Sequence, residues 1–76
     1  DSEVIDVVAA LGSPITEGPL SEISIPPGIS IGAVSSANGV TIACGETVVE
    51  AGDTVVVLAL ESKHKAAAKL FKRGLF

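Results

Sequence analysis

The stretch "ISIGAVSSANGVTIAC", residues 29–44, constrains the fold more than any other part of the chain. Asn38-Gly39 separates two runs rich in β-branched residues, and both positions tolerate the positive φ of a two-residue type I′ loop. A loop at these positions pairs Ser35 with Ile42. We therefore expect an antiparallel hairpin. One of its faces is expected to carry Ile29, Ile31, Ala33, Val40, Ile42 and Cys44.

Further elements are expected on both sides of this hairpin. Residues 3–9 show the period-two alternation of a strand, with Val4, Asp6 and Val8 on one face and Ile5, Val7 and Ala9 on the other. Residues 19–23 predict one or two helical turns, because Pro19 suits the first position of a helix. The run "TVVVLALE", residues 54–61, is typical of a strand buried on both faces.

The chain is expected to end in an amphipathic helix. Ser62 is a good N-cap for a helix over residues 63–71, and Gly74 suits the position after it. The apolar side is expected to hold Ala66, Ala67, Leu70 and Phe71. The opposite side is expected to hold Lys65, Lys69, Lys72 and Arg73. The complete order predicts a small α+β domain, β-α-β-β-β-α, with an antiparallel sheet.

The size and composition of the chain favour a single domain that associates with a partner. Residues 1–76 are enough for one core, but that core has two Phe and no Trp, Tyr or Met. A core this small is often completed by another subunit, so we expect an oligomer. The chain starts at Asp1 and contains no Met, so we expect a fragment of a longer protein. No apolar run approaches the roughly 20 residues that cross a membrane, so no membrane insertion is expected.

Charge is divided sharply along the sequence. All nine acidic residues lie in residues 1–61, and all five basic residues lie in residues 63–73. Binding to DNA or RNA depends on neutralising phosphates with Lys and Arg, so a body without cations is not a nucleic-acid surface. The single cysteine, Cys44, excludes an internal disulfide and is compatible with a reducing cytosol. We expect Cys44 to be a small strand residue.

The sequence contains one fragment that resembles a hydrolase motif. Gly28, Ser30 and Gly32 match G-x-S-x-G, and Asp53 and His64 follow in hydrolase order. The motif requires a strand, a strained turn at the serine and then a helix, but β-branched residues and a hairpin follow here. The only histidine also has no second base near it in the sequence. We therefore expect no enzymatic activity.

The doubled stretch "GETVVEAGDTVV" raises the question of a metal or phosphate site. Glu46, Glu50 and Asp53 are the candidate metal ligands, because hard cations need several converging oxygens. Neither Gly45 nor Gly52 opens a helix, so a phosphate-binding loop is excluded. The alternative is two turns that each lead into a strand, in which the glycines supply special backbone angles and the acids accept turn N–H groups. We expect the two turns, and we expect no metal to bind at this stretch.

Several short motifs follow one another in a characteristic order. They are Leu20-x-x-Ile23, Pro27-Gly28, Ile31-Gly32-Ala33-Val34, Gly45-Glu46-Thr47-Val48 and Gly52-Asp53-Thr54-Val55-x-Val57. Together they resemble the TrkA C-terminal domain family (RCK_C), the regulatory lobe of potassium-transport gating proteins. The ending "AAAKLFKRGLF" is similar to the last helix and tail of that family. The resemblance covers about residues 3–76 and is most specific over 20–60.

The resemblance implies a cytoplasmic, dimeric regulatory domain that does no chemistry. Such a domain follows a nucleotide-binding RCK_N domain and docks on a membrane potassium transporter at the inner face of the cell membrane. No cofactor is expected in this domain, and NAD(H) or ATP/ADP would belong to an adjoining RCK_N domain outside this chain. The resemblance leaves open the same module in another transporter, an anion symporter or antiporter. A small-ligand or divalent-cation sensor is the remaining alternative.

Some relatives in this family bind cyclic di-AMP between two subunits, through the strand before the hairpin and a basic residue near its end. The matching position here is Ser36, and residues 1–62 contain no Lys or Arg. We therefore expect cyclic di-AMP to bind weakly or not at all. The candidate residues for a ligand pocket at the dimer interface are Ile31, Ser36, Asn38 and Val40.

Overall fold

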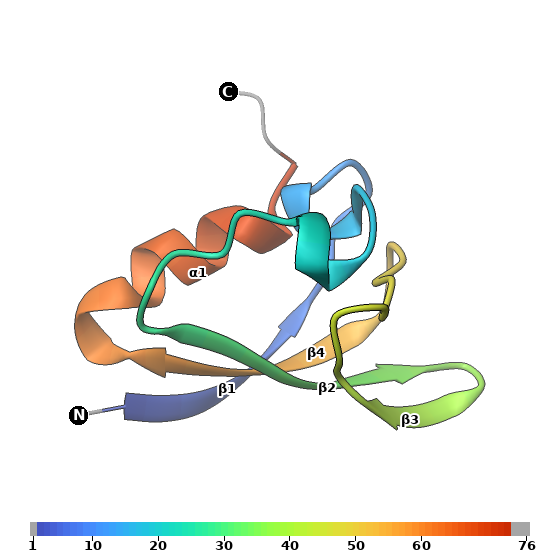
Figure 1. Ribbon diagram of the computed structural model, residues 1–76, viewed down its shortest axis with the longest axis horizontal. Helices are drawn as coiled ribbons and strands as arrows, with labels where there is room; N and C mark the ends of the chain where they lie inside the picture. Colours follow the sequence, from blue (N-terminus) through green and yellow to red (C-terminus); the bar gives the residue numbers. More distant parts are fainter. Residues whose placement is uncertain (1, 74–76) are drawn as a thin grey trace.

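The computed structural model describes residues 2–73 and arranges them in two layers, a four-stranded sheet and a helical cover on one of its faces (Figure 1). The elements in chain order are β1 (Ser2–Val8), η1 (Pro14–Thr16), η2 (Leu20–Glu22), β2 (Ile29–Ser36), β3 (Gly39–Ile42), β4 (Thr54–Leu60), η3 (Glu61–Lys63) and α1 (His64–Phe71). The η elements are short 3-10 helices. The strand order is β1-β4-β2-β3, and every neighbouring pair is antiparallel. The predicted α+β class is confirmed.

The last strand, β4, lies in the middle of the sheet. It pairs with β1 on one side and with β2 on the other, and its β-branched sequence suits this position. Residues opposite each other in an antiparallel pair point to the same face. Val57 faces Ile5 on β1 and Ile31 on β2, and these three side chains point toward the helical layer. Val55, Val57 and Ala59 are completely buried.

The prediction that the "TVVVLALE" strand is buried on both faces is wrong within this chain. Leu58 is 44% exposed and Leu60 is 41% exposed. The reason is the two-layer architecture, because the helical segments cover only one face of the sheet (Figure 1). The sheet therefore has a covered face, which carries the core, and a second face, which we call the open face.

The hairpin forms as predicted, but its register differs from the prediction. Ala37-Asn38 makes the turn, so that Ser36 pairs with Gly39 and Ser35 pairs with Val40 rather than with Ile42. Gly39 keeps a positive φ of 116°, but it begins β3 instead of completing the loop. The loop is therefore shifted by one residue relative to the Asn-Gly prediction.

An irregularity at Gly32 changes the faces of β2. The pairing with β4 shifts between Ile31 and Ala33, which is the signature of a β-bulge. As a result Ile29, Ile31 and Val34 point to the covered face. The predicted single face is therefore divided, because Ala33, Val40 and Ile42 lie on the open face and Cys44 lies beyond the end of β3.

Helix α1 supplies the largest buried side chain of the core. Phe71 is 2% exposed, and Ala67 and Leu70 are also buried, as the apolar side of the helix predicts. The carbonyl of Phe71 accepts a hydrogen bond of 2.9 Å from the N–H of Ala10, which fixes the end of the helix to the chain after β1. The complete buried core is Ala9, Ile15, Leu20, Ile29, Val34, Val49, Val55, Val57, Ala59, Ala67, Leu70 and Phe71.

The start of α1 differs from the prediction. Glu61–Lys63 forms a 3-10 turn directly after β4, so Lys63 takes the N-cap position and Ser62 does not. No side chain caps this helix by a hydrogen bond. The predicted role of Gly74 falls outside the described residues. Pro19 likewise lies at the N-cap of η2, one residue earlier than predicted.

Two consecutive turns share one hydrogen-bond pattern. In the first, the N–H of Thr47 donates to the Cys44 carbonyl (3.1 Å), and the N–H of Cys44 donates to the Thr47 hydroxyl (3.0 Å). In the second, the N–H of Asp53 donates to the Glu50 carbonyl (3.0 Å), and the N–H of Glu50 donates to Asp53 Oδ2 (3.0 Å). The structural repeat thus pairs Thr47 with Asp53, although the sequence repeat pairs Thr47 with Thr54.

These two turns correct three predictions about the doubled stretch. Gly52 has a positive φ of 92°, but Gly45 does not have a positive φ. The Thr47 hydroxyl takes the acceptor role that we expected of Glu46. The second turn leads into β4, but the first leads only to an isolated bridge between Pro19 and Val48. The first turn cannot begin a strand of the sheet because η2 occupies the adjacent space, with Leu20 donating to the carbonyl of Thr47.

Candidate functional site

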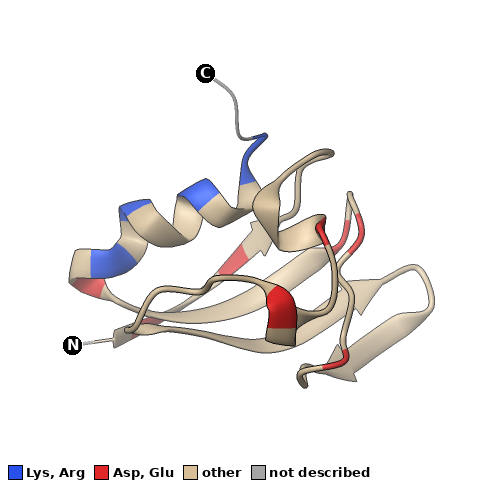
Figure 2. Ribbon diagram, turned by 45° about the horizontal axis from the view of Figure 1, so that its top comes forward, with Lys and Arg blue, Asp and Glu red and all other residues tan. Residues whose placement is uncertain are grey.

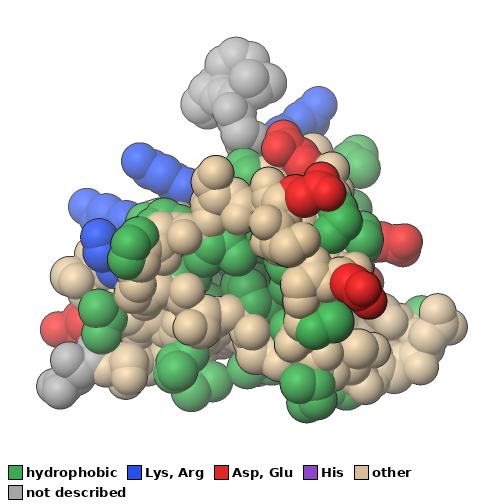
Figure 3. Space-filling view, viewed as in Figure 1, with side chains coloured by type: hydrophobic (Ala, Val, Ile, Leu, Met, Phe, Trp, Pro, Cys, Tyr) green, Lys and Arg blue, Asp and Glu red, His purple; other side chains and the backbone are tan. Residues whose placement is uncertain are grey.

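The open face of the sheet is the most extensive unusual feature of the surface. Six large apolar side chains on it are 41% to 77% exposed, and they come from three strands. They are Val4, Val8, Val40, Ile42, Leu58 and Leu60. Figure 3 shows hydrophobic side chains along this side of the molecule, away from α1. Isolated exposed apolar residues are normal, but a contiguous patch on one face is typical of an interaction surface.

The shape and the charge of the open face also suit a protein–protein interface. Strand β2 contributes only the small residues Ser30, Ala33 and Ser35, and they lie between the larger side chains of β4 and β3. The only charged side chain that the strand registers place on this face is Asp6, on β1. Depletion of charge at the centre is characteristic of the buried core of protein–protein interfaces.

The structure brings some of the ligand and metal candidates together. Ser36 and Asn38 at the hairpin turn line the same hollow, of about 670 Å³, as Glu50 and Asp53 in the second turn. The walls of this hollow contain two carboxylates and no Lys or Arg. A negatively charged ligand would therefore meet like charge there, which agrees with the expectation that cyclic di-AMP binds weakly; that expectation stays a prediction.

The other two ligand candidates lie elsewhere. Ile31 lines a second groove, of about 450 Å³, between η2 and the start of β2, where Leu20 and Ile25 form part of the wall. Val40 is 70% exposed on the open face. The four candidates Ile31, Ser36, Asn38 and Val40 are therefore divided among three places on the chain.

The metal candidates do not form a site. Oδ2 of Asp53 already accepts the N–H of Glu50, and Glu46 belongs to the preceding turn. Across residues 2–73, no three His, Cys, Asp or Glu side chains gather in a way that could hold a metal ion. The Asp53 carboxylate is a turn acceptor, and Glu46 and Glu50 are exposed.

Cys44 has a different environment from the one that the sequence predicts. It lies beyond β3, in the first turn and at the rim of the 450 Å³ groove, and it is exposed. Its Sγ lies 3.5 Å from the Thr47 hydroxyl. Hydrogen bonding by that hydroxyl, and then by the backbone N–H of Glu46, holds the pKa of the Cys44 thiol below its ordinary value. The expectation of a strand residue is wrong.

The hydrolase-like fragment is not assembled into a catalytic site. Ser30 pairs with Leu58 and points to the open face, whereas His64 begins the helix over the covered face. Nε2 of His64 lies 3.3 Å from Oε1 of Glu3, an electrostatic contact without hydrogen-bond geometry. Asp53 is engaged in its own turn. The sheet thus separates the serine from the histidine.

The order of the elements and the glycine-bearing turns match a known family. A model of the TrkA-C domain matches residues 4–72. The match includes the whole of α1 and all four strands, except for the first two residues of β1. The chain belongs to the TrkA-C domain family. This confirms the resemblance seen in the motifs between Leu20 and Val57.

Two proteins of known identity are similar to the chain. The Trk system potassium uptake protein TrkA homolog 2 of Methanosarcina mazei is 37% identical over 71 residues, which cover 93% of this chain. The Trk system potassium uptake protein TrkA of Azorhizobium caulinodans is 38% identical over 73 residues, which cover 96% of this chain. In both cases the chain corresponds to 16% of the relative's length.

The open face is the feature that sequence reasoning missed. Its signal was present, because the run from Thr54 to Leu60 is apolar at both odd and even positions and so predicts two apolar faces. Nothing in the sequence says that one of these faces stays uncovered by the chain itself.

Among residues 2–73, no helix has the length and apolar character to cross a membrane.

Proposed function

We propose that this TrkA-C domain is a non-catalytic regulatory domain of a Trk-type potassium uptake system and that it works by pairing with a second copy through the open face. The observation that carries the pairing is the set of six exposed apolar side chains on one side of the sheet. The names of the two relatives support the potassium uptake system. The same reasoning gives a cytoplasmic location, beside a membrane potassium transporter subunit.

The size of the open face limits the surface that a pair can bury. The domain measures 32 × 28 × 19 Å, and Figure 1, which is viewed along the shortest axis, shows α1 stacked above the sheet, so the sheet extends along the 32 Å and 19 Å axes. A standard interface buries about 800 Å² on each partner, so a pair formed through this face lies at the small end of the range. The β4 side chains Leu58 and Leu60 would form the centre of the contact, and the small residues of β2 would receive side chains of the partner.

Pairing through a sheet gives the domain a means of transmitting change. The sheet is rigid because β4 is hydrogen-bonded on both sides, and β1 is attached to it along seven residues. A displacement of one copy would therefore move the other as a unit and alter the gating of the attached transporter. Nucleotide binding, by NAD(H) or ATP/ADP, would take place in an adjoining RCK_N domain outside this chain.

A domain exchange tests this function. The corresponding segment of the Azorhizobium caulinodans TrkA protein is replaced by this chain, and potassium-dependent growth and uptake are measured in cells that lack their own TrkA. We expect the chimera to restore uptake and the same chimera with Leu58→Lys to lose it, with equal amounts of protein in both strains. Failure of the unmutated chimera, when it is present at normal levels, would contradict the proposed role.

A further inference from the structure

Strand β1 forms a long, unpaired edge of the sheet. It lies at the end of the strand order, and its seven residues pair with β4 without a register shift. The opposite edge strand, β3, has only four residues and pairs with the bulged strand β2. Short length, bulges, Pro and Lys protect the edges of natural sheets, and β1 has none of these four. The outer side of β1 is therefore the less protected edge.

The hydrogen bonding of Ala9 shows which backbone groups of β1 face outward. Its N–H donates to the carbonyl of Asp53, directly before β4, at 2.9 Å. Peptide groups alternate between the two edges of a strand, so every second residue before Ala9 also bonds toward β4. The N–H and C=O groups of Val4, Asp6 and Val8 therefore point away from the sheet, where residues 2–73 supply no further strand. They form a ladder of free donors and acceptors that an added strand can use.

Val4, Asp6 and Val8 also present a simple side-chain pattern. All three are exposed, and the registers place them on the open face with Asp6 between the two valines. A strand added at this edge places its own side chains directly opposite them. Aliphatic pairs and pairs of opposite charge are favourable at such positions, whereas like charges destabilise the contact. The edge therefore favours a strand with aliphatic, basic and aliphatic residues at successive alternate positions.

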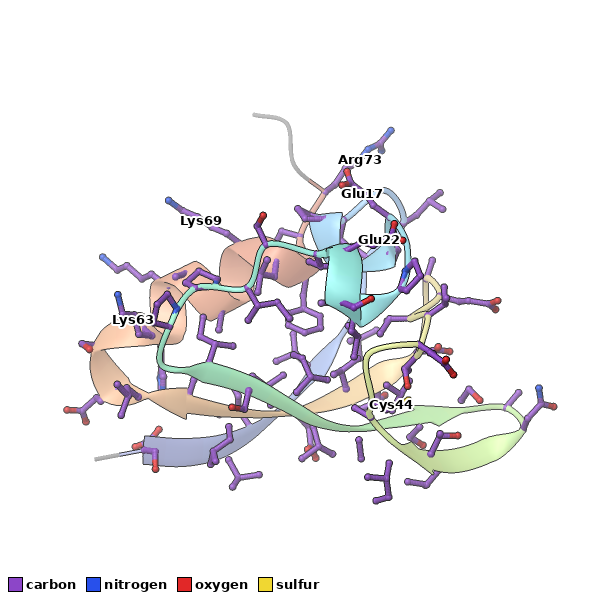
Figure 4. The ribbon with its side chains drawn as sticks, viewed as in Figure 1. Glu17, Glu22, Cys44, Lys63, Lys69 and Arg73 are labelled. Carbon is purple, nitrogen blue, oxygen red and sulfur yellow. The ribbon has the colours of Figure 1, made fainter. Side chains whose placement is uncertain are left out.

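Among residues 2–73, no Lys or Arg neutralises Asp6. Figure 2 shows Lys and Arg only in the segments that follow β4, and none on the four strands. Figure 4 shows Lys63 and Lys69 pointing away from the sheet. The one ion pair of the described chain joins Glu3 and His64. The Asp6 carboxylate is thus free to pair with a cation of another molecule.

We propose that the outer edge of β1 binds an extended segment of another protein, in which Lys or Arg is flanked two residues away on each side by aliphatic residues. The cation of that segment lies opposite Asp6, and its aliphatic side chains lie opposite Val4 and Val8. In strand addition of this kind, main-chain hydrogen bonds supply the affinity and alternate side chains supply the specificity. This binding goes beyond the proposed function, and it uses the edge of the sheet and not pairing through the open face.

A second copy of β1 fits this edge less well than a basic segment does. The register that pairs all seven residues is centred on Ile5, and it makes the two Asp6 side chains diagonal neighbours, about 7–8 Å apart. A shift by one residue, to a centre at Asp6, places the two carboxylates directly opposite each other. Each copy also carries a net charge of −4. Charge complementarity therefore favours a basic partner.

The test uses the blocked synthetic peptide Thr-Val-Thr-Lys-Thr-Val-Thr, and NMR of the isotope-labelled chain reads each backbone amide separately. The amides of Val4, Asp6 and Val8 are expected to exchange rapidly with solvent in the free chain and to become protected when the peptide binds. Methylation of the backbone nitrogens of the two peptide valines removes donors that face β1, and it is expected to lower the affinity roughly tenfold. Methylation of the two threonines beside the lysine, whose N–H groups face away, is the matched control and should change the affinity little.

Charge reversal tests the contact with Asp6. Asp6→Lys is expected to lower the affinity for this peptide about tenfold, and a peptide with Glu in place of Lys is expected to bind the variant better than the wild type. Glu22→Lys makes the same change in net charge on η2 and should leave the affinity unchanged.

Three results overturn the proposal. The first is no binding at millimolar peptide. The second is an equal effect of the two methylation patterns or of the two charge reversals, because only non-specific attraction acts without regard to the ladder and to Asp6. The third is protection of the three outward amides that grows with the concentration of the chain alone, because this would assign the edge to a second copy.

Discussion

Val4 on β1 lies directly opposite Leu58 on β4, and both side chains point away from the helical layer into solvent. They are 66% and 44% exposed. The residues next to them, Ile5 and Val57, form the corresponding pair on the covered face, where Val57 is completely buried. Two adjacent pairs of similar side chains thus have opposite environments. Substitutions in the buried pair therefore test the stability of the fold, and substitutions in the exposed pair test association with another molecule.

Truncation of Val57 is expected to destabilise the fold. Val57→Ala removes two buried methyl groups and leaves a cavity, so the free energy of unfolding should fall by about 2 kcal/mol. Leu58→Ala is the control at the next position. It should change the free energy of unfolding of the monomer by less than about 1 kcal/mol. Urea unfolding at low protein concentration measures both. Equal effects of the two substitutions would show that Leu58 is also buried in the monomer.

Two glycines allow backbone strain to be separated from a steric clash. Gly28 and Gly52 have positive φ angles of 91° and 92°. A Cβ at position 52 meets nothing within 4 Å, whereas a Cβ at position 28 would lie 2.9 Å from Cδ1 of Leu60. Gly52→Ala should cost about 1 kcal/mol of stability from strain alone, and Gly28→Ala about 2 kcal/mol. Thermal unfolding measures the difference between the two variants. A larger loss of stability at position 52 than at position 28 would contradict this account of the two glycines.

The carboxylate of Asp53 is expected to act as a turn acceptor and not as a metal ligand. Asp53→Ala leaves the N–H of Glu50 without its acceptor and should cost about 1 kcal/mol, whereas Asp53→Asn keeps an acceptor oxygen and should cost less. Addition of calcium should leave the melting temperature of the wild type unchanged. A rise in melting temperature with calcium that Asp53→Ala abolishes would instead support a cation site at these turns.

The Cys44 thiol is expected to ionise at lower pH than an ordinary cysteine, because the Thr47 hydroxyl stabilises the thiolate. Thr47→Val removes the hydroxyl and should raise the pKa, so that less thiolate is present near neutral pH and alkylation by iodoacetamide slows there. At pH values above both pKa values the two rates should converge. Thr47→Ser keeps a hydroxyl and should resemble the wild type; the same midpoint of the pH–rate curve in all three proteins would rule out this role for Thr47.

The sequence predicted the elements of the fold well because each one has a strong local signal. Alternation defined β1, the apolar run defined β4, and the helical spacing of Ala67, Leu70 and Phe71 defined the buried side of α1. The Asn-Gly pair did not give the register of the hairpin, because the turn lies at Ala37-Asn38 and Gly39, although its φ is positive, already pairs with Ser36. The bulge at Gly32 was also not predictable from local sequence, because it lies in the pairing with β4, which is far along the chain.

The candidate site was predicted less well, for a physical reason. Apolar side chains on both faces of β4 indicate burial, but a single sequence does not distinguish burial by its own helices from burial by another molecule. The candidates Ser36, Asn38, Glu50 and Asp53 line one hollow only because the end of β2, the hairpin turn and the second turn meet there. The six-residue structural repeat was hidden because Thr47 and Asp53, which differ in chemistry, accept equivalent hydrogen bonds.

The central claim is that the open face pairs two copies of the domain. Sedimentation equilibrium of the chain over a wide concentration range tests it most directly, with Leu58→Lys as the variant and Ser24→Lys, an exposed position outside the strands, as the control. The account predicts a mass that rises to twice the 7.6 kDa of the monomer for the wild type and Ser24→Lys and that stays at the monomer value for folded Leu58→Lys. A wild type that remains monomeric at the highest concentration, or a Leu58→Lys variant that pairs as well as the wild type, would contradict it.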